Sequence, residues 1–228
     1  MNCVILCGGL GKRISKYFKD LPKILIMVNK KPFIEYKIDQ LKKIKKIILC
    51  TGYKGEKINE YFIKKPNAKI IIKKEKILSG TGGSLKKILK HIKSENFFFT
   101  YGDNYLVDLP ITKMIQSIKK DKKSVMLIYK NNNKYDKSNI KILSNKKLIY
   151  DKNPNFNGNY IDYGFFYLNK KHIKKCMDKN IKFDFSVILN ALIKKDLITY
   201  IIVKKRFYEI GGINGYKNFE RYARSKGL

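Results

Sequence analysis

The chain has 228 residues, of which 44% are hydrophobic, a length and composition that favour one globular domain over residues 1–228. It has no apolar run near the ~20 residues of a membrane span and no basic segment at its apolar N-terminus, so we expect a cytoplasmic protein without membrane contact. The net charge of +33 comes from lysines spread over the whole chain, with arginine at four positions, and this spread argues against a nucleic-acid-binding patch. The four cysteines form no CxxC pair, and we expect them to be reduced.

Strand and helix patterns alternate through the first half of the chain. Apolar runs predict strands at residues 2–7, 46–51, 69–73 and 96–100. Apolar residues at helical spacing predict helices at 33–43 and 55–62, and residues 80–92 are predicted to be a loop leading into a helix. The alternation predicts an α/β fold with a doubly wound, mixed but mostly parallel sheet flanked by helices.

The second half of the chain is less regular. Strands are predicted at residues 124–129, 160–168 and 198–204, and helices at 111–119, 185–194 and 215–223. A hairpin is predicted from residues 139–142 and 147–150 around Ser144-Asn145. No internal repeat and no convincing domain boundary interrupt the pattern.

The most informative segment is Gly8-Gly9-Leu10-Gly11, which follows the first predicted strand. Glycines leave backbone N–H groups open to the close approach of phosphates, and we expect a helix to start behind them. Arg13 and Lys23 follow at a spacing that lets both face the same phosphates. Asp103 also follows a predicted strand, and ligands of such sheets bind at the carboxyl ends of the strands. The segment and Asp103 are therefore expected to share one crevice.

Other glycine-loop sites fit the residues less well. A dinucleotide site would have GxGxxG and an acidic residue at the end of the second strand, but that strand ends in Thr51-Gly52-Tyr53. The P-loop pattern is absent too. A turn that only joins a strand to a helix would require neither Arg13 nor Pro22-Lys23. The residues therefore favour a triphosphate site.

Over nearly its whole length the chain resembles the sugar-phosphate nucleotidyltransferases, which join a nucleoside triphosphate (NTP) to a sugar 1-phosphate. The family's opening motif, GGxGTRL followed by PK, is similar to residues 8–14 and Pro22-Lys23. Residues 161–164 (IDYG) and 208–211 (YEIG) are similar to a heptose 1-phosphate guanylyltransferase-like branch. The resemblance implies a Rossmann-like, GT-A-like fold. It also implies GTP and a heptose or hexose 1-phosphate as substrates, in lipopolysaccharide or capsule biosynthesis.

The resemblance also implies roles for individual residues. The residues it assigns to nucleotide binding are Leu6, Gly8, Gly9, Gly11, Lys12, Arg13, Gly80, Thr81, Gly82 and Gly102, with Arg13 and Lys23 catalytic. The residues it assigns to the sugar phosphate are Lys152, Asp162, Tyr163 and Gly164. Asp103 and Glu209 are the implied ligands of Mg²⁺.

Three departures from the family pattern leave alternatives open. Lys12 replaces a threonine, Glu209 replaces an aspartate, and Asp162-Tyr163 replaces a small polar pair. A catalytically silent, nucleotide-binding regulatory homologue is one alternative, and an enzyme that uses UTP, CTP or dTTP with a hexose 1-phosphate is another. We expect no nucleic-acid partner, and because members of the family are often oligomers, a homo-oligomer stays open.

The implied reaction suits these residues chemically. An oxygen of the sugar phosphate would attack the α-phosphorus of the nucleotide, and pyrophosphate would leave. The attacking group is already an anion, so no general base is needed, and a chain with two histidines can carry the reaction. The difficulty is the repulsion between two anions, which fixed cations and Mg²⁺ reduce.

Overall fold

The computed structural model describes residues 1–228, which form two compact units. Each unit is assembled from segments that are far apart in the sequence. Unit 1 contains Met1–Leu78, Thr100–Val107 and Phe207–Leu228, and unit 2 contains Ser79–Phe99 and Asp108–Arg206. No single point in the sequence therefore divides the two units.

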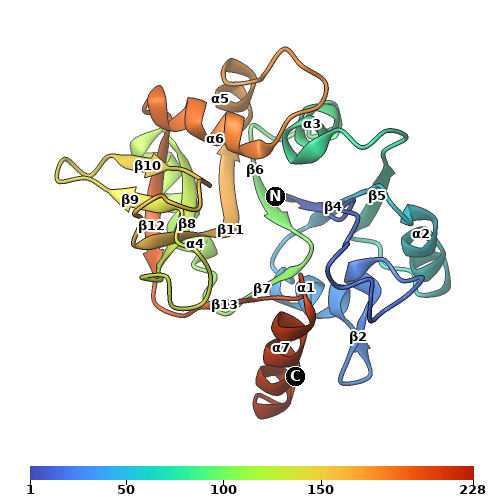
Figure 1. Ribbon diagram of the computed structural model, residues 1–228. Helices are drawn as coiled ribbons and strands as arrows, with labels where there is room; N and C mark the ends of the chain where they lie inside the picture. The colour runs from blue at the N-terminus through green and yellow to red at the C-terminus, as the bar shows by residue number, and fades with distance from the viewer. The chain divides into compact units, whose positions relative to one another are not determined.

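Unit 1 is built around the parallel strands β1, β4 and β5, in the order β1-β4-β5. Each of these strands is a short, largely aliphatic run, which suits strands with both faces covered. Two short strands, β7 and β13, pair antiparallel, and α7 lies beside β13 (Figure 1). The elements are β1 (Asn2–Leu6), η1 (Lys23–Leu25), β2 (Met27–Val28), β3 (Lys31–Pro32), α1 (Phe33–Gln40), β4 (Lys46–Thr51), α2 (Gly55–Lys64), β5 (Ile70–Lys74), β7 (Asn104–Leu106), β13 (Phe207–Glu209) and α7 (Ile213–Ser225).

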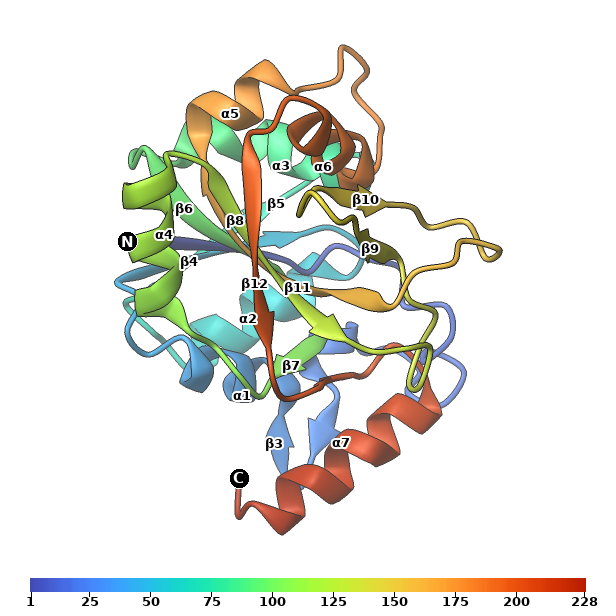
Figure 2. The ribbon, with the colours of Figure 1, turned by 90° about the vertical axis from the view of Figure 1, so that its left-hand side faces the viewer.

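Unit 2 has mixed strand directions. Strand β8 lies between β11, to which it is antiparallel, and β12, to which it is parallel (Figure 2). Strands β9 and β10 form an antiparallel hairpin beside β11. The elements are α3 (Gly80–Ile88), η2 (Leu89–His91), β6 (Asn96–Tyr101, whose end belongs to unit 1), α4 (Ile111–Asp121), β8 (Ser124–Lys130), β9 (Ile140–Ile142), β10 (Leu148–Tyr150), β11 (Tyr160–Asn169), α5 (Lys170–Lys175), α6 (Phe185–Lys194) and β12 (Ile198–Val203).

Each unit has an aromatic core of its own. In unit 1, the buried Phe33, Tyr36 and Phe219 pack edge to face, which fixes α7 against α1. In unit 2, the ring of Phe98 on β6 stacks on that of Tyr167 on β11, with centroids 4.3 Å apart. These contacts hold each set of strands rigidly enough to position side chains at the strand ends.

The predicted α/β architecture with flanking helices is confirmed, and most predicted elements lie within one to three residues of the observed ones. The helix expected behind the glycine loop is wrong, because residues 12–20 form turns. The first predicted helix ends at Gln40 rather than residue 43. Elements that the patterns did not predict are short: β2, β3, β7, β13 and α5.

The cysteines and helices add two observations. All four cysteines are free and buried. Burial raises the pKa of the Cys3 thiol to about 12, and burial also raises the pKa of the Cys7 thiol.

The helices are all too short or too polar to cross a membrane.

Candidate active site

The glycine loop leaves β1 and passes close to the end of β4. A side chain at Gly8 would bring its Cβ to 3.1 Å from the backbone nitrogen of Gly52, so glycine at this position eases the close approach of the two segments. Gly11 has a φ of +61°, which other residues adopt with strain. A Cβ at Gly9 would meet nothing within 4 Å, so this side of the loop is open. The open backbone agrees with the expected phosphate-binding role of the loop, which stays a prediction.

Lys23 and Asp103 form an ion pair in unit 1. The Nζ of Lys23 lies 2.6 Å from Oδ2 of Asp103, and the two side chains are only 17% and 27% exposed. Asp103 reaches this position because the N–H of Gly102 donates to the carbonyl of Leu6 at 2.9 Å, which joins the ends of β6 and β1. A Cβ at Gly102 would come within 2.9 Å of the Cys7 sulfur, so this junction requires glycine.

Arg13 and Glu209 form a second, more exposed ion pair in unit 1. One guanidinium nitrogen of Arg13 lies 3.3 Å from Oε1 of Glu209, with side-chain exposures of 78% and 39%. In the β7–β13 ladder Glu209 pairs with Asn104, the residue after Asp103. The N–H of Ile210 donates to the Asp103 carbonyl at 2.9 Å. Strand pairing therefore brings the backbones of Asp103 and Glu209, more than a hundred residues apart in the sequence, to neighbouring positions.

This arrangement matches what Mg²⁺ requires of a protein at a phosphate site. Mg²⁺ is commonly held by one or two carboxylates together with substrate phosphates, rather than by an all-protein cage. Asp103 and Glu209 supply two such carboxylates, and the structure has no cluster of three metal-ligating side chains. The donor set therefore fits a metal that arrives with, or completes its shell from, a triphosphate.

In unit 2, Lys152 pairs with Asp184 at 2.6 Å. Asp184 also caps the N-terminus of α6, because its carboxylate accepts from the N–H of Ser186. Burial opposes the charge on Asp184, but the hydrogen bonds from Lys152 and Ser186 outweigh it and lower its pKa to about 2. The lysine expected to hold a sugar phosphate is therefore held in place by a capping carboxylate.

Asp162 lies where β11 departs from regular pairing with β8. The register shifts between Asp162 and Phe166, and Gly164 has a φ of +71°. The N–H of Gly164 donates to Oδ1 of Asp162 at 2.8 Å. Burial raises the pKa of Asp162 to about 6, while the Gly164 hydrogen bond and the charge of Lys152 oppose the rise.

Tyr163, one of the expected sugar-phosphate contacts, has its side chain in the core. Its side chain is fully buried, and its hydroxyl accepts from the Asp108 N–H at 3.0 Å and donates to the Arg206 carbonyl at 3.4 Å. A ring enclosed in the core leaves only the backbone of Tyr163 for a contact with a sugar phosphate. The contacts expected from Asp162, Tyr163 and Gly164 on this strand stay predictions.

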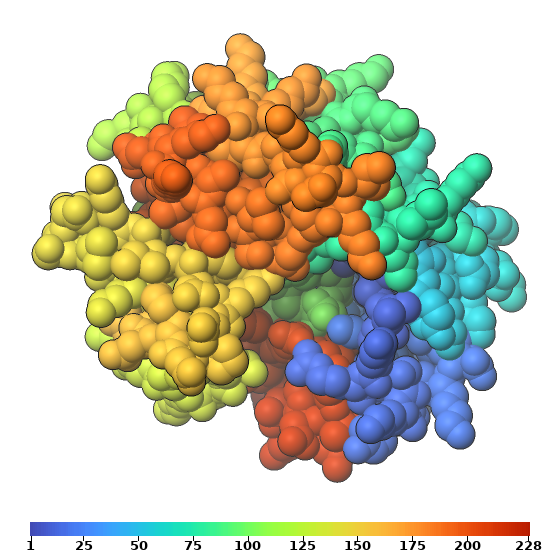
Figure 3. Space-filling model, turned by 45° about the horizontal axis from the view of Figure 1, so that its top comes forward, coloured from blue at the N-terminus to red at the C-terminus, as the bar shows by residue number.

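The segment Gly80–Gly83 is a helix start rather than the predicted loop, because α3 begins at Gly80. The N–H groups of Gly82 and Gly83 donate to the Phe183 carbonyl, and a Cβ at Gly82 would overlap the Phe183 ring. The hydroxyl of Thr81 donates to Asp184 and accepts from the N–H of Phe185. The loop between α5 and α6 and the start of α3 both lie on the face drawn in Figure 3. In this structure the Gly82 N–H is therefore taken by protein, and nucleotide contacts by Gly80 and Thr81 stay predictions.

Sequence reasoning missed three polar residues that contact the site residues. Asp184 is the partner of Lys152, and Lys37 and Asn104 form a buried hydrogen-bond cluster next to Asp103. Lys37 could have been noticed, because it lies four residues after Phe33 on the apolar face of α1. Asp184 could have been noticed as the polar residue just before the predicted helix 185–194.

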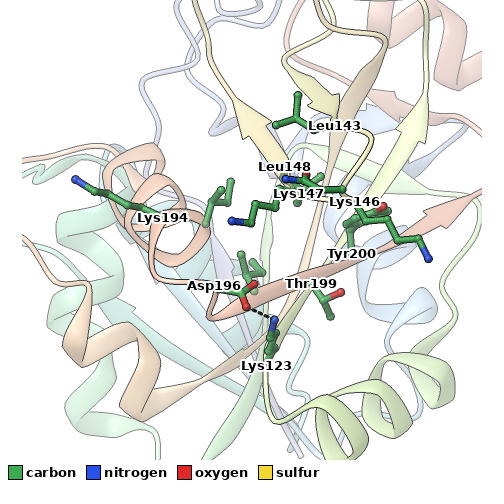
Figure 4. A pocket seen from close by; sticks show the side chains of 12 residues that line it. Lys123, Leu143, Lys146, Lys147, Leu148, Lys194, Asp196, Thr199 and Tyr200 are labelled. Atoms are coloured by element: carbon green, nitrogen blue, oxygen red, sulfur yellow. Dashed lines mark hydrogen bonds and ion pairs between the residues drawn. The ribbon is translucent and has the colours of Figure 1, made fainter.

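Unit 2 also contains a cavity of about 620 Å³ between the β9–β10 turn, the end of α6 and β12 (Figure 4). Four of its 12 lining residues are lysines, and one of them, Lys123, pairs with Asp196 at 2.6 Å. About one residue in five of the whole chain is lysine, so about two or three would be expected in any set of this size. The charge of this cavity therefore does not mark it as a binding site.

Comparisons with known proteins found a matching family and several similar proteins. Residues 3–156 match the model of the MobA-like NTP transferase domain. The D-glycero-alpha-D-manno-heptose 1-phosphate guanylyltransferase of Campylobacter jejuni is 48% identical over 56 residues, which are 24% of this chain and 25% of the relative. The choline-phosphate cytidylyltransferase of Streptococcus pneumoniae is 46% identical over 55 residues, 23% of this chain and 24% of the relative. The sequence matches thus cover about a quarter of each curated relative.

Among solved structures, HddC from Yersinia pseudotuberculosis is similar over 97% of this chain and 98% of its own, with a TM-score of 0.77 and 27% identity. HddC has also been solved in complex with GMP-PN. The likeness to HddC covers both units, whereas the family model ends at residue 156. Because the model covers more than half of the sequence, the chain belongs to the MobA-like NTP transferase family.

Proposed function

We propose that this protein transfers a nucleotidyl group from an NTP to a sugar 1-phosphate and releases pyrophosphate. The observation that carries the proposal is in unit 1, where Arg13 and Lys23 pair with Glu209 and Asp103 beside an open glycine loop. Two cations and two carboxylates at strand ends suit a reaction in which charge on phosphate oxygens must be balanced.

We propose GTP as the nucleotide and a heptose 1-phosphate as its co-substrate. Support comes from the guanylyltransferase of Campylobacter jejuni and from HddC, which was solved with GMP-PN. The cytidylyltransferase of Streptococcus pneumoniae has nearly the same identity, so CTP belongs in any test. Hexose 1-phosphates belong there as the alternative co-substrates that the sequence left open. We place the reaction in the cytoplasm, where NTPs are made and consumed.

Substrate binding would exchange the partners of the four charged groups. Arg13 and Lys23 are each paired with a carboxylate of the same unit. A triphosphate would draw Arg13 and Lys23 toward its oxygens and release Asp103 and Glu209 to hold Mg²⁺. Bound there, Mg²⁺ would supply neutralisation of the phosphate charge.

The reaction forms one bond and breaks one. An oxygen of the sugar phosphate bonds to the α-phosphorus as the bond from that phosphorus to the β-phosphate oxygen breaks. Pyrophosphate leaves with the electron pair, and no proton has to move. Arg13 and Lys23 would hold the phosphates in line and stabilise the charge that develops on their oxygens. In unit 2, Lys152 would bind the sugar phosphate after exchanging Asp184 for it.

A pyrophosphate-release assay tests the proposal directly. The protein is incubated with Mg²⁺, each of the four common NTPs and a panel of heptose and hexose 1-phosphates, with Asp103→Ala as the negative control. We expect release with GTP and a heptose 1-phosphate that depends on Asp103. If no combination of NTP and sugar 1-phosphate releases pyrophosphate, the proposal is wrong. Nucleotide binding without turnover would indicate the catalytically silent homologue instead.

A further inference from the structure

Lys37 on α1 is a lysine buried in the interior of unit 1. It is 1% exposed, and all its hydrogen-bond partners are neutral. Its Nζ lies 3.1 Å from the Thr100 hydroxyl, 3.0 Å from the Asn104 carbonyl and 2.6 Å from the Asn104 side-chain oxygen. Burial of a lysine away from water is unfavourable, and here it lowers the pKa of Lys37 to about 7.

A merely structural lysine could be replaced by an apolar residue of similar length, since its neighbours on α1 are apolar. Phe33 and Tyr36, on the same side of the helix, belong to the hydrophobic core. The position instead carries an amine with three acceptors, the number that an ammonium group can satisfy. All three acceptors lie within residues 100–104, the turn that carries Asp103.

This turn also sets the place of the second carboxylate. Asn104, which accepts two of the three hydrogen bonds, is the ladder partner of Glu209. The carbonyl of Asp103 accepts from the N–H of Ile210, the residue after Glu209. One buried amine thus holds the turn that carries Asp103 and the start of β7, the strand that pairs with the Glu209 strand β13.

We propose that Lys37 is a positioning residue that fixes the turn of residues 100–104 and so presents the carboxylates of Asp103 and Glu209 together for a divalent cation. The proposal rests on the proposed function, because that function assigns the metal to these two carboxylates. The hydrogen bonds of Lys37 go to Thr100 and Asn104, and none of these three bonds reaches the glycine loop or Arg13. Its loss should therefore loosen cation binding while leaving the contacts of the nucleotide phosphates in place.

The test separates cation binding from nucleotide binding in the full-length protein. Mn²⁺ affinity is measured by electron paramagnetic resonance with GTP bound, because the two carboxylates alone do not complete a metal shell, and GTP affinity is measured by calorimetry in EDTA. For Lys37→Met we expect Mn²⁺ affinity to fall at least tenfold and GTP affinity to stay within about twofold of wild type. Ile34→Ala removes an equally buried side chain of α1 that has no polar partner, and it should leave both affinities unchanged.

A milder variant keeps the test decisive if Lys37→Met does not fold. Thr100→Val removes one of the three acceptors, and we expect a roughly threefold loss of Mn²⁺ affinity with unchanged GTP affinity. Wild-type Mn²⁺ affinity in the folded variants, or equal losses of both affinities, would overturn the positioning role. Asp103→Asn distinguishes failure of the metal assignment from failure of the Lys37 proposal. If Asp103→Asn leaves Mn²⁺ affinity unchanged, the assignment of the metal to Asp103 and Glu209 is wrong. If Asp103→Asn loses Mn²⁺ affinity but the Lys37 and Thr100 variants do not, the metal assignment holds and the positioning role of Lys37 is wrong.

Discussion

The two units hold their charged site residues in different ways. In unit 1 Lys23 and Arg13 each have their own carboxylate, and the pairs Lys23–Asp103 and Arg13–Glu209 are placed by strand ends and strand pairing. In unit 2 two carboxylates, Asp184 and Asp162, act on the single cation Lys152. Asp184 bonds to Lys152 directly and has a lowered pKa, whereas burial raises the pKa of Asp162.

This difference in pairing predicts how the ion pairs of each unit respond when an anionic substrate binds. In unit 1 the charges of the two pairs balance, so we expect a triphosphate and a divalent cation to replace the internal partners pairwise. In unit 2 an arriving phosphate must compete with a carboxylate that also caps α6. We therefore expect changes in unit 1 to act on the rate of reaction and changes in unit 2 to act on affinity for the sugar phosphate.

The largest expected effect is on turnover, from Asp103→Asn and Lys23→Met. Each variant removes one fixed charge that the proposed transition state requires, so kcat should fall by roughly 10²–10³-fold. Lys64→Met, which changes an exposed lysine on α2, serves as the control for loss of positive charge. Steady-state pyrophosphate release measures all three, and kcat within twofold of wild type for Lys23→Met would remove Lys23 from the reaction.

The next effect is a pH dependence of stability that belongs to Asp162. Its pKa is raised in the folded state from 3.8 to about 6, so the folded protein holds that proton more tightly than the unfolded chain between these values. The contribution of Asp162 to the free energy of unfolding should therefore fall as pH rises from about 4 to 6, by about 1 to 3 kcal/mol. Asp162→Asn should abolish this loss, as judged by urea denaturation at several pH values.

Asp151→Asn provides the comparison for that experiment, since Asp151 is an exposed carboxylate near the same strands. It should keep the wild-type pH profile. If Asp162→Asn has the same pH profile as wild type, Asp162 does not contribute a raised pKa to stability. The difference described between the carboxylates of unit 1 and unit 2 would then not hold for Asp162.

A smaller effect is expected from Lys152→Gln. Loss of one charge-assisted hydrogen bond to the sugar phosphate should raise its KM roughly tenfold, with a smaller change in kcat. Lys147→Gln changes a lysine of the β9–β10 turn and should leave KM unchanged. If Lys152→Gln lowers kcat as strongly as Lys23→Met does, the assignment of rate to unit 1 and affinity to unit 2 is wrong.

The smallest expected effect concerns stability in unit 1. Arg13 and Glu209 form an exposed pair, and such pairs contribute less than about 1 kcal/mol. Arg13→Ala should therefore change the free energy of unfolding by less than that amount in urea denaturation while it lowers turnover. A larger loss of stability would mean that this pair serves the fold rather than the substrate.

Local patterns in the sequence predicted the helices and strands whose own residues form an apolar or periodic run. Strand β4 and helix α6 have the predicted bounds, because each is a continuous apolar or periodic run. Strands β7 and β13 have three residues each, and they exist because they pair with one another across the sequence. No local pattern contains that information.

In the candidate site, too, local sequence patterns predicted some features, and contacts between distant segments determined the others. The motif residues of the glycine loop and Asp103 lie at strand ends as expected, since strand direction alone places them there. The pairing of Arg13 with Glu209 and the burial of Tyr163 depend on contacts between distant segments. Glycines 82 and 83 suggested an open loop, yet they are needed for close packing against the segment that carries Phe183.

The buried cysteines can report on the unfolding of the unit in which they lie. Cys3, Cys7 and Cys50 belong to unit 1 and Cys176 to unit 2, and all four thiols are shielded from solvent in the folded chain. A thiol that is both buried and protonated reacts with alkylating reagents only after its surroundings open. Mass spectrometry of alkylated peptides would therefore time the unfolding of the two units separately in the unmodified protein, without any introduced label.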